Sequence, residues 1–370
     1  MPLVEFYKPH KLSPKRLDRY LAGGWFRSSN GLFRNRILCL DGRLCSVVNI
    51  RLPLKDHSFK KPHKRLLNKC ADLRVEIAPL AICAQMEGLY YLTRHRFKGF
   101  VFPELNSFLY DFLDRKIFRS YHVKVYHNNL LIAASVFDVG ERSCMSVLGL
   151  YDPEYKHLSL GILTMLLEIQ WAKEQGHTHY YPGYVLDETS TFDYKKSLGT
   201  YEYLSETKRW IKDYNKVVSQ SPVIELDAKT RELALALHRT KIPHQQLLYK
   251  LFSLGYAYPQ GTFLRHPIIF ILPELSDNPF KVSVVAYDYE RKCYRVSHPL
   301  PVHDEFLAQN QSEEYQDPHL YYDMILQDSL EDDMLFTKPA DACQEILRLL
   351  NKKSHRNPLD RLFLGKPSAG

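Results

Sequence analysis

Apolar and polar positions alternate in residues 121–127, the first of three short strand-like runs between residues 121 and 151. Residues 121–127 and 130–139 are separated by the turn sequence Asn128-Asn129, and residues 143–151 follow a second turn. Alternation of this kind is typical of strands, and tight turns join neighbouring strands in antiparallel order. The pattern therefore predicts a three-stranded antiparallel meander.

The apolar positions on either side of the meander follow helical spacing. Helices are predicted for residues 81–97 and 103–118, and another helix of about 15 residues begins near Leu160. A strand, 178–186, follows that last helix. The order of helix, meander, helix and strand is that of acetyltransferase-type (GNAT) α/β folds, in which the helix after the meander presents its N-terminus to a phosphate of the donor.

The front of the chain predicts a smaller mixed unit. Strand candidates 32–40 and 43–52 flank Asp41-Gly42, a tight-turn sequence that predicts an antiparallel pair. Residues 60–70 are a short basic helix candidate, and residues 73–80 are a strand candidate.

Beyond about residue 215 the pattern predicts further folded structure but no chemical motif. Helices are expected for 228–240, 243–256 and 339–353, and a hairpin for 280–300.

We therefore expect an α+β protein in three parts. A basic α+β N-terminal domain occupies residues 1–100, and a GNAT-like mixed sheet with flanking helices occupies 101–215. A C-terminal α+β extension follows over residues 216–370.

The excess positive charge lies in the front of the chain. Residues 1–76 contain 17 Lys and Arg against 6 Asp and Glu, a net charge of +11, whereas residues 216–370 contain 18 against 20, a net charge of −2. A basic stretch favours a polyanionic partner such as nucleic acid, because each neutralised phosphate releases counterions. A solvated basic surface is the alternative.

The composition favours a cytoplasmic location. No apolar stretch of about 18 residues is present, so we expect no membrane partner, and the first residues lack the apolar segment of a secretion signal. The seven cysteines are odd in number, irregularly spaced and without a CxxC pair. This argues against a disulfide framework or a four-cysteine zinc site, so reduced thiols are expected.

Several short motifs occur together in one order along the first 212 residues. They are Gly24-Trp25-Phe26-Arg27, Ile50-Arg51, Asp152-Pro153, Ser159-Leu160-Gly161, Tyr180-Tyr181-Pro182-Gly183-Tyr184 and Tyr194-Lys195. Their order and spacing resemble the arginyl-tRNA–protein transferase family, which includes bacterial leucyl-transferring members. The family's N-terminal cysteine cluster is missing here.

The resemblance implies transfer of an aminoacyl group from the 3′ end of a charged tRNA to the N-terminal amine of an acceptor protein. Arginyl-tRNA is the expected donor and leucyl-tRNA the second choice, and no DNA partner is implied. The ester is already activated, so no metal or cofactor is expected. The protein must instead hold the tRNA end, orient the amine and stabilise the oxyanion.

Residue roles follow from the resemblance together with side-chain chemistry. The expected catalytic residues are Asp152, Glu188 and Tyr184. Substrate binding is expected for Trp25, Arg27, Arg51, Ser159, Leu160, Gly161, Asp187, Tyr194 and Lys195. The residues expected to bind tRNA phosphates are Lys60, Lys61, Lys64 and Arg65.

Structural explanations compete with these roles. Asp152 suits an Asp-Pro turn, Asp187 and Glu188 suit a solvated loop, and Ser159 with Gly161 suits an ordinary helix cap. Two other function classes also remain. An acetyl-CoA enzyme of the same fold would need a Q/R-x-x-G-x-G/A loop, which residues 156–161 lack. The other class is a non-catalytic tRNA- or protein-binding relative.

Overall fold

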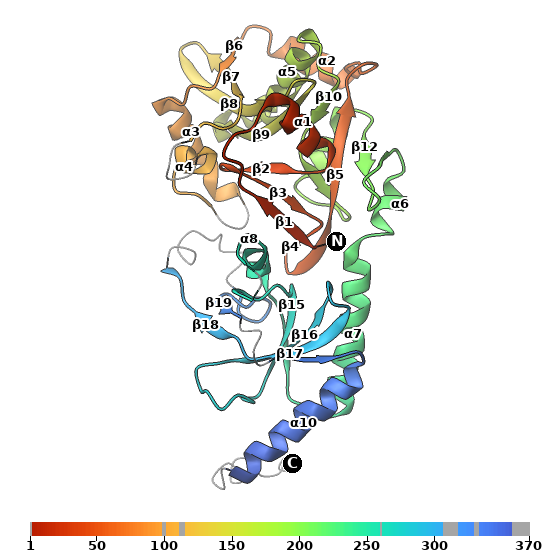
Figure 1. Ribbon diagram of the computed structural model, residues 1–370. Helices are drawn as coiled ribbons and strands as arrows, with labels where there is room; N and C mark the ends of the chain where they lie inside the picture. The colour runs from red at the N-terminus through yellow and green to blue at the C-terminus, as the bar shows by residue number, and fades with distance from the viewer. Residues whose placement is uncertain are drawn as a thin grey trace, which may run out of the picture.

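The chain folds into a front lobe, residues 2–218, and a C-terminal domain, residues 222–356 (Figure 1). The computed structural model describes residues 2–97, 101–110, 115–259, 261–305, 317–328 and 333–356. The long helix α7 (Pro222–Arg239) runs from the front lobe along one side of the C-terminal domain.

A large mixed sheet forms the centre of the front lobe. Its strand order is β13 (Trp210–Ile211), β12 (Glu202–Leu204), β5 (Arg43–Pro53), β10 (His179–Tyr181), β9 (Ser143–Tyr151), β8 (Leu130–Val139), β7 (Ser120–His127) and β6 (Arg74–Pro79). The expected meander is confirmed as β7, β8 and β9, paired antiparallel. Strand β10 joins β9 in parallel. Because β5 joins this sheet as well, residues before and after 100 share one sheet.

Helices cover both faces of this sheet. Helices α3 (Ala84–Thr93) and α4 (Leu105–Leu109) bury apolar residues against one face, and α5 (Leu160–Glu174) against the other. The basic helix predicted for 60–70 is α2 (Lys61–Lys69), which packs beside α5. The helix predicted for 103–118 is confirmed only at α4, and its residues 111–114 lie outside the described ranges.

A small sheet of β1 (Val4–Tyr7), β3 (Gly31–Asn35) and β2 (Phe26–Ser28) lies beside helix α1 (Pro14–Ala22). Gly24 connects α1 to this sheet at φ +79°, where a Cβ atom would overlap Leu204 and crowd Asn49. The Gly24-Trp25 motif therefore has a steric reason for its glycine. The pair predicted around Asp41-Gly42 is confirmed as β4 (Ile37–Leu40) with β5.

The C-terminal domain contains a five-stranded antiparallel sheet. Its order is β14 (Gln245–Leu248), β15 (Ile268–Leu272), β16 (Ser283–Asp288), β17 (Cys293–Ser297) and β20 (Met334–Phe336). Helices α7 and α10 (Pro339–Arg356) pack against it, and the shorter η4 (Lys250–Ser253) and α8 (Leu254–Ala257) lie toward the front lobe. A small pair of strands, β18 (Leu300–Val302) and β19 (Ile325–Gln327), completes the domain.

The predictions for this domain are partly correct. The hairpin at 280–300 is confirmed as β16 and β17, and the helix at 339–353 is confirmed as α10. The helix predicted for 243–256 is wrong in its first half, which forms β14, and its second half is confirmed as the short helices η4 and α8. In β14, Leu247 is buried and Gln245 is exposed while the backbone pairs with β15, so tertiary pairing overrides the helical spacing.

One hydrophobic core joins the two parts. Leu3 and Val4 of the N-terminal segment pack in the same buried cluster as Phe270, Val285 and the rest of the C-terminal sheet interior. Strand β4 contributes three further residues to that cluster, Ile37, Cys39 and Leu40.

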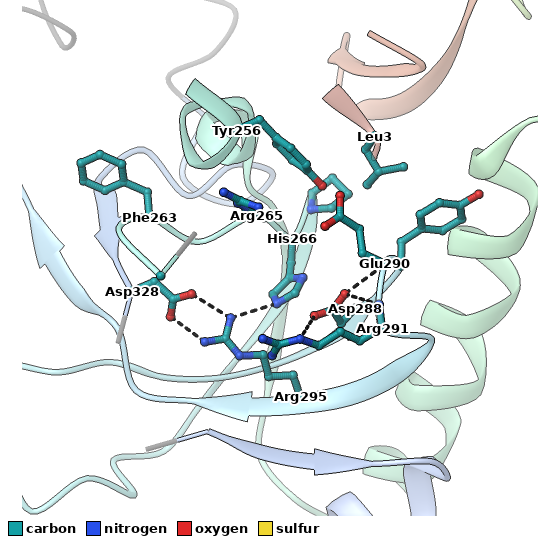
Figure 2. Close-up of a pocket in the computed structure, with 13 residues that line it drawn as sticks. Leu3, Tyr256, Phe263, Arg265, His266, Asp288, Glu290, Arg291, Arg295 and Asp328 are labelled. Atoms are coloured by element: carbon teal, nitrogen blue, oxygen red, sulfur yellow. Dashed lines mark hydrogen bonds and ion pairs between the residues drawn. The ribbon is translucent and has the colours of Figure 1, made fainter. Parts of the chain in front are cut away.

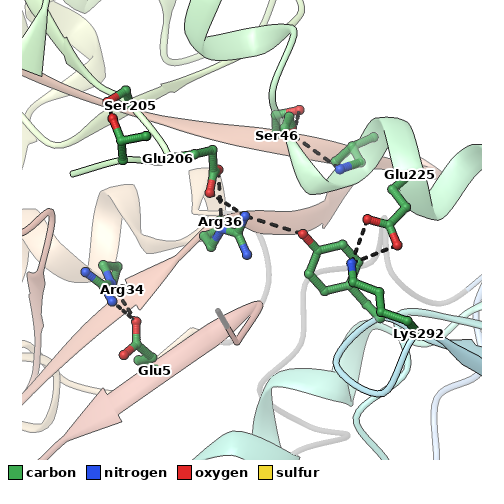
Figure 3. A network of polar contacts seen from close by, with 12 residues as sticks. Glu5, Arg34, Arg36, Ser46, Ser205, Glu206, Glu225 and Lys292 are labelled. Atoms are coloured by element: carbon green, nitrogen blue, oxygen red, sulfur yellow. Dashed lines mark hydrogen bonds and ion pairs between the residues drawn. The ribbon is translucent and has the colours of Figure 1, made fainter. Parts of the chain in front are cut away.

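Polar contacts reinforce this junction (Figure 3). Arg36 pairs with Glu206 inside the front lobe and also reaches the Tyr289 hydroxyl of the C-terminal domain at 3.5 Å. Ser221 donates to Ser46 at 2.6 Å between their hydroxyl oxygens. The C-terminal domain is therefore fixed to the front lobe by buried apolar surface as well as by hydrogen bonds.

Across the described ranges no helix is both long and apolar enough to cross a membrane. All seven cysteines are reduced thiols.

Candidate functional site

Strands β9 and β10 separate after three paired residues. They pair in parallel from Ser143 with His179 to Met145 with Tyr181. Beyond that point Pro182-Gly183 turn the chain into β11 (Tyr184–Leu186), which pairs with β5 instead, so the predicted strand 178–186 is divided in two. Gly183 has φ +104°, a conformation that glycine adopts without strain. An open cleft of about 810 Å³ begins at this separation.

The walls of the cleft are mainly apolar and aromatic. The front lobe contributes, among others, Phe26, Phe33, Phe102, Phe108, Met145, Val147, Tyr184 and Phe192. The described residues that line the cleft include no Asp or Glu, and their cationic members are Arg27, Lys195 and Lys250. A cleft of this size and character is typical of a binding site for a small organic group.

Lys195 is a buried cation inside this cleft. Its ammonium group donates to the carbonyl oxygen of Tyr184 at 3.2 Å and lies about 5 Å from the ring centres of Tyr184 and Phe192. Burial lowers the pKa of Lys195 to about 8. No carboxylate of the described chain pairs with it, so an anionic ligand in the cleft would find a cation without a counter-charge.

Arg27 lines the same cleft but is fully engaged within the protein. Its guanidinium pairs with the buried carboxylate of Asp138 at 2.9 Å and donates to Ser29 and Ser120 at 2.8 and 2.9 Å. It also packs 4.4 Å from the Phe118 ring centre. Burial raises the pKa of Asp138, and the arginine opposes that shift. These contacts make Arg27 a support of the cleft wall.

The two tyrosines expected at the site lie close to Lys195. Tyr184 lines the cleft between Phe26 and Phe192, and burial raises its pKa to about 12, so its hydroxyl stays protonated and can donate. The Tyr194 ring is about half exposed. Its pKa is also raised to about 12, first by burial of the hydroxyl and then by the charge of Glu168.

A bulge in β9 places one extra residue at the cleft. Phe137 of β8 pairs with Ser146 and Val136 pairs with Leu148, which leaves Val147 without a partner on β8. Both Ser146 and Val147 line the cleft. Bulges of this kind redirect backbone and side chains next to binding sites.

Glu168 of α5 is a buried carboxylic acid behind this bulge. It accepts a hydrogen bond from the Tyr180 hydroxyl at 2.6 Å, and its other carboxylate oxygen has no hydrogen-bond partner in the described chain. Burial raises its pKa to about 7, and the nearby hydroxyls of Ser135 and Ser146 oppose the shift. The group therefore titrates near neutral pH. A lone acid in the apolar run 160–172 is the signal that could have identified it.

The three carboxylates expected at the site have other partners. Asp152 caps the short helix η2 (Pro153–Leu158) by accepting from the Glu154 amide at 3.0 Å, as a turn former does. Asp187 accepts from the amide and hydroxyl of Ser46 at 3.1 and 2.5 Å. Glu188 is exposed and pairs with Arg43.

None of these three carboxylates lines the cleft. Their expected roles in binding and catalysis stay predictions without support from these contacts.

The start of α5 differs from an ordinary helix cap. Ser159 has the left-handed conformation φ 50°, ψ 44°, and its side chain makes no capping hydrogen bond. A Cβ atom on Gly161 would meet only the Tyr151 ring at 3.7 Å, an ordinary contact, so packing does not require glycine. The amides of Ile162 and Leu163 donate to the Ser159 carbonyl at 3.0 Å, so it is the amides of Leu160 and Gly161 that have no acceptor within the helix and point along its axis. Such an end suits a phosphate oxygen or a developing oxyanion.

The basic helix α2 packs beside α5. The four residues expected to bind tRNA, Lys60, Lys61, Lys64 and Arg65, are exposed on or beside α2. At the other end of α2, Lys69 donates to the carbonyl of His157, just before the start of α5. The basic surface of α2 therefore continues toward the N-terminus of α5.

Trp25 and Arg51 are half-buried within the front lobe. Trp25 packs on Tyr20 and under the Arg34 guanidinium. Arg51 pairs with Glu202 at 2.7 Å and lies 4.5 Å from the Trp210 ring centre. Neither residue lines the cleft, so these contacts give them a structural role and leave their expected substrate contacts untested.

A second pocket lies in the C-terminal domain and holds about 30 Å³, the space of a single water (Figure 2). Arg295 fills its base, with both terminal nitrogens 2.8 Å from the carboxylate of Asp328. The imidazole of His266 is buried beside it, and burial lowers its pKa to about 4. This pocket is an internal ion-pair network too small for a substrate.

The splayed strands and the apolar cleft define an α+β protein with a ligand-binding cleft, and comparison with known proteins identifies its family. The family model described as "Arginine-tRNA-protein transferase, C terminus" matches residues 89–205. An aspartate/glutamate leucyltransferase of Shewanella sp. (strain MR-4) is 32% identical over 196 residues, which cover 52% of this chain and 80% of that protein. The protein of the same name from Helicobacter hepaticus is 28% identical and covered over 93% of its length.

The chain therefore belongs to the arginyl-tRNA–protein transferase family, and it is an aminoacyltransferase whose donor is an aminoacyl-tRNA.

Solved structures are less similar. L-PGS from Bacillus licheniformis is 14% identical, with 47% of this chain and 52% of that chain covered and a TM-score of 0.31. A GCN5-related N-acetyltransferase from Kribbella flavida is 16% identical, with 42% and 54% covered and a TM-score of 0.25. Similarities this low do not define the fold of this chain.

Proposed function

We propose that the protein transfers leucine from leucyl-tRNA to the N-terminal amine of proteins that begin with Asp or Glu. The observation that carries the acceptor assignment is Lys195, a buried ammonium group in the cleft with no carboxylate partner in the described chain. An acidic side chain at the acceptor's first position would supply the missing charge. The names of the relatives from Shewanella and Helicobacter agree with this choice.

The lining of the cleft supports an apolar aminoacyl group. A guanidinium held in a cleft would need a carboxylate, and the described residues of the lining provide none. Phe26, Met145, Val147 and Tyr184 instead provide the apolar surface that a leucine side chain would bury. Arginine, the donor expected from the resemblance, stays a prediction with less support.

The chemistry is aminolysis of an ester. The neutral acceptor amine attacks the aminoacyl carbonyl carbon, a C–N bond forms, and the bond to the terminal ribose oxygen breaks. The amine loses a proton and the ribose oxygen gains one, so the products are a lengthened protein and a tRNA with a free terminal hydroxyl. Lys195 holds the acceptor side chain, and the Tyr184 hydroxyl is available to donate to the carbonyl oxygen.

The tRNA part of the donor is held outside the cleft. The start of α5 offers free amides to one phosphate or to the oxyanion, and the exposed basic residues of α2 meet phosphates further along the tRNA. Because charged tRNA is found where translation occurs, this donor fits the expected cytoplasmic location.

A direct test uses tRNA charged with a mixture of radiolabelled amino acids and a panel of peptides that differ in their first residue. We expect leucine to appear on peptides that begin with Asp or Glu and to be nearly absent from those that begin with Asn, Ala or Arg. Transfer of arginine alone would overturn the donor assignment. Equal labelling of all peptides would overturn the role of Lys195, and no labelling of any peptide would overturn the function.

A further inference from the structure

The C-terminal domain supplies one wall of the cleft. Helices η4 and α8 contribute six lining residues: Lys250, Leu251, Phe252, Ser253, Leu254 and Ala257. Figure 1 shows α8 between the front lobe and the C-terminal sheet, below β1. Residues of β1 and β4, including Phe6 and Ile37, continue the same wall.

This wall is rigidly supported. Phe252 is buried in the core shared by both parts of the molecule. At Gly255 a Cβ atom would approach the Phe263 carbonyl oxygen to 2.8 Å, so α8 lies directly on the neighbouring backbone. Arg265 donates to the Gly255 carbonyl at 2.6 Å and to the Tyr258 carbonyl at 3.2 Å. These contacts hold η4 and α8 against the C-terminal domain.

Lys250 places a positive charge on this wall. Its ammonium lies 5.5 Å from the ring centre of Tyr321, and the side chain is about half-buried. Burial lowers its pKa to about 8, while the exposed carboxylate of Asp323 favours the charged form. The cleft thus contains Lys195 on the front-lobe side and Lys250 on the C-terminal side.

An acceptor protein must leave the cleft along one of its walls. Its first residue lies at Lys195 under the proposed function, and its later residues continue as an extended chain at about 3.3 Å per residue. The η4–α8 wall offers such a chain apolar surface and one cation. The basic, phosphate-binding surface of α2 lies instead beside α5, on the opposite face of the large sheet from α3 and α4.

We propose that η4 and α8 form a second acceptor subsite, in which Lys250 selects proteins with an acidic residue at position 2 or 3. This inference rests on the proposed function, since it assumes that an acceptor N-terminus occupies the cleft. It assigns to the C-terminal domain the selection of acceptors beyond their first residue.

The test compares peptides that all begin with Asp and carry Asp or Ala at positions 2 and 3. For the wild-type protein we expect kcat/KM to be higher on the acidic peptides. Lys250→Met should lower kcat/KM about tenfold on those peptides and less than twofold on the Ala-Ala peptide. Lys250→Arg should retain the preference, and Lys250→Glu should shift it toward Lys at the same positions. Lys241→Met, at an exposed site of the same domain, is the matched control.

Direct binding separates this inference from the proposed function. Fluorescence anisotropy of labelled peptides measures the preference at positions 2 and 3 even if no transfer occurs. If the wild-type protein transferred no amino acid but still bound acidic peptides through Lys250, the proposed function would be wrong and the proposed subsite would stand. Equal losses on all peptides would overturn the subsite, as would a loss of charged-tRNA affinity with an unchanged peptide preference.

Discussion

Within the described chain, the ammonium group of Lys195 donates a hydrogen bond to the carbonyl oxygen of Tyr184 at 3.2 Å. A carbonyl oxygen only partly compensates a buried positive charge, so burying the protonated lysine costs free energy. A carboxylate that binds beside it would reduce this cost.

Lys195→Met should abolish the preference for Asp and Glu at the acceptor's first position. We expect kcat/KM on acidic peptides to fall at least about a hundredfold, with tRNA affinity unchanged and the fold equally or more stable, because a buried charge is removed. Steady-state transfer with Asp- and Ala-initiated peptides measures this. Lys196→Met, on an exposed lysine paired with Asp193, is the matched control. A variant that keeps its preference would place the acidic side chain elsewhere.

The same residue predicts a pH profile. The acceptor amine must be neutral, and its pKa lies near 8, so kcat/KM should rise with pH up to that range. The pKa of Lys195 is lowered to about 8, so its charge is lost above that pH and kcat/KM on acidic peptides should fall again. Lys195→Met should lose the falling limb. A falling limb that persists in this variant would belong to another group.

Gly161 allows stability and tRNA binding to be separated. Gly161→Asp fits sterically, and its charge in the first turn of α5 should stabilise the helix by about 0.3–1 kcal/mol. The same charge should repel a phosphate, so the affinity for charged tRNA should fall at least about tenfold. Gly161→Ala should raise stability and leave affinity within about twofold. Thermal unfolding and filter binding measure the two effects, and retained affinity in Gly161→Asp would exclude this helix start as an anion site.

The basic surface of α2 predicts a salt dependence. Changing Lys60, Lys61, Lys64 and Arg65 together to Ala should weaken tRNA binding and reduce the slope of log K against log salt by about 3. The helix itself should become more stable, because its first turn contains no acidic residue to balance these charges.

A matched control for α2 changes the exposed residues Arg231, Arg239, Lys241 and Lys352 of the C-terminal domain, which should leave the slope unchanged. An unaltered slope in the α2 variant would place the tRNA on another surface.

Glu168 predicts that stability falls between pH 5 and pH 8. Its pKa is raised from 4.5 to about 7 in the folded protein, so the folded state binds the proton more tightly than the unfolded chain. The contribution is complete below pH 4.5 and is lost as pH rises through 7, by about 3 kcal/mol. Glu168→Gln should lose this part of the pH dependence, measured by urea unfolding. The control Glu174→Gln, exposed on the same helix, should retain it.

The sequence predicted individual helices and strands more reliably than it predicted which strands pair with each other. The meander, α2, α5 and the hairpin of β16 and β17 follow from local periodicity, and each was confirmed. The first half of the segment 243–256 was misassigned because its pairing with β15 depends on residues 20 or more positions away. The periodicity of a segment carries no information about such a partner.

The same limit applies to the candidate site. Motif spacing singled out Lys195, Tyr184 and the Ser159–Gly161 turn, and the structure places Lys195 and Tyr184 in the cleft, while their roles stay predictions. Asp187 and Arg27 were predicted to bind substrate through their charges. Each of these charged groups already bonds to a residue far away in the sequence, Asp187 to Ser46 and Arg27 to Asp138. Lys250 reaches the cleft from a domain without a recognisable motif, so only the three-dimensional arrangement places it there.

The shared core also determines the order in which the chain can finish folding during synthesis. Leu3 and Val4 are made before Leu233, Phe270 and Ile346, which belong to the same buried cluster. Long-range contacts of this kind form slowly, and domains normally fold as they emerge. Leu3 and Val4 therefore cannot be buried in this cluster before its C-terminal residues are made, and the cleft wall that β1 shares with η4 and α8 needs the chain as far as Ala257.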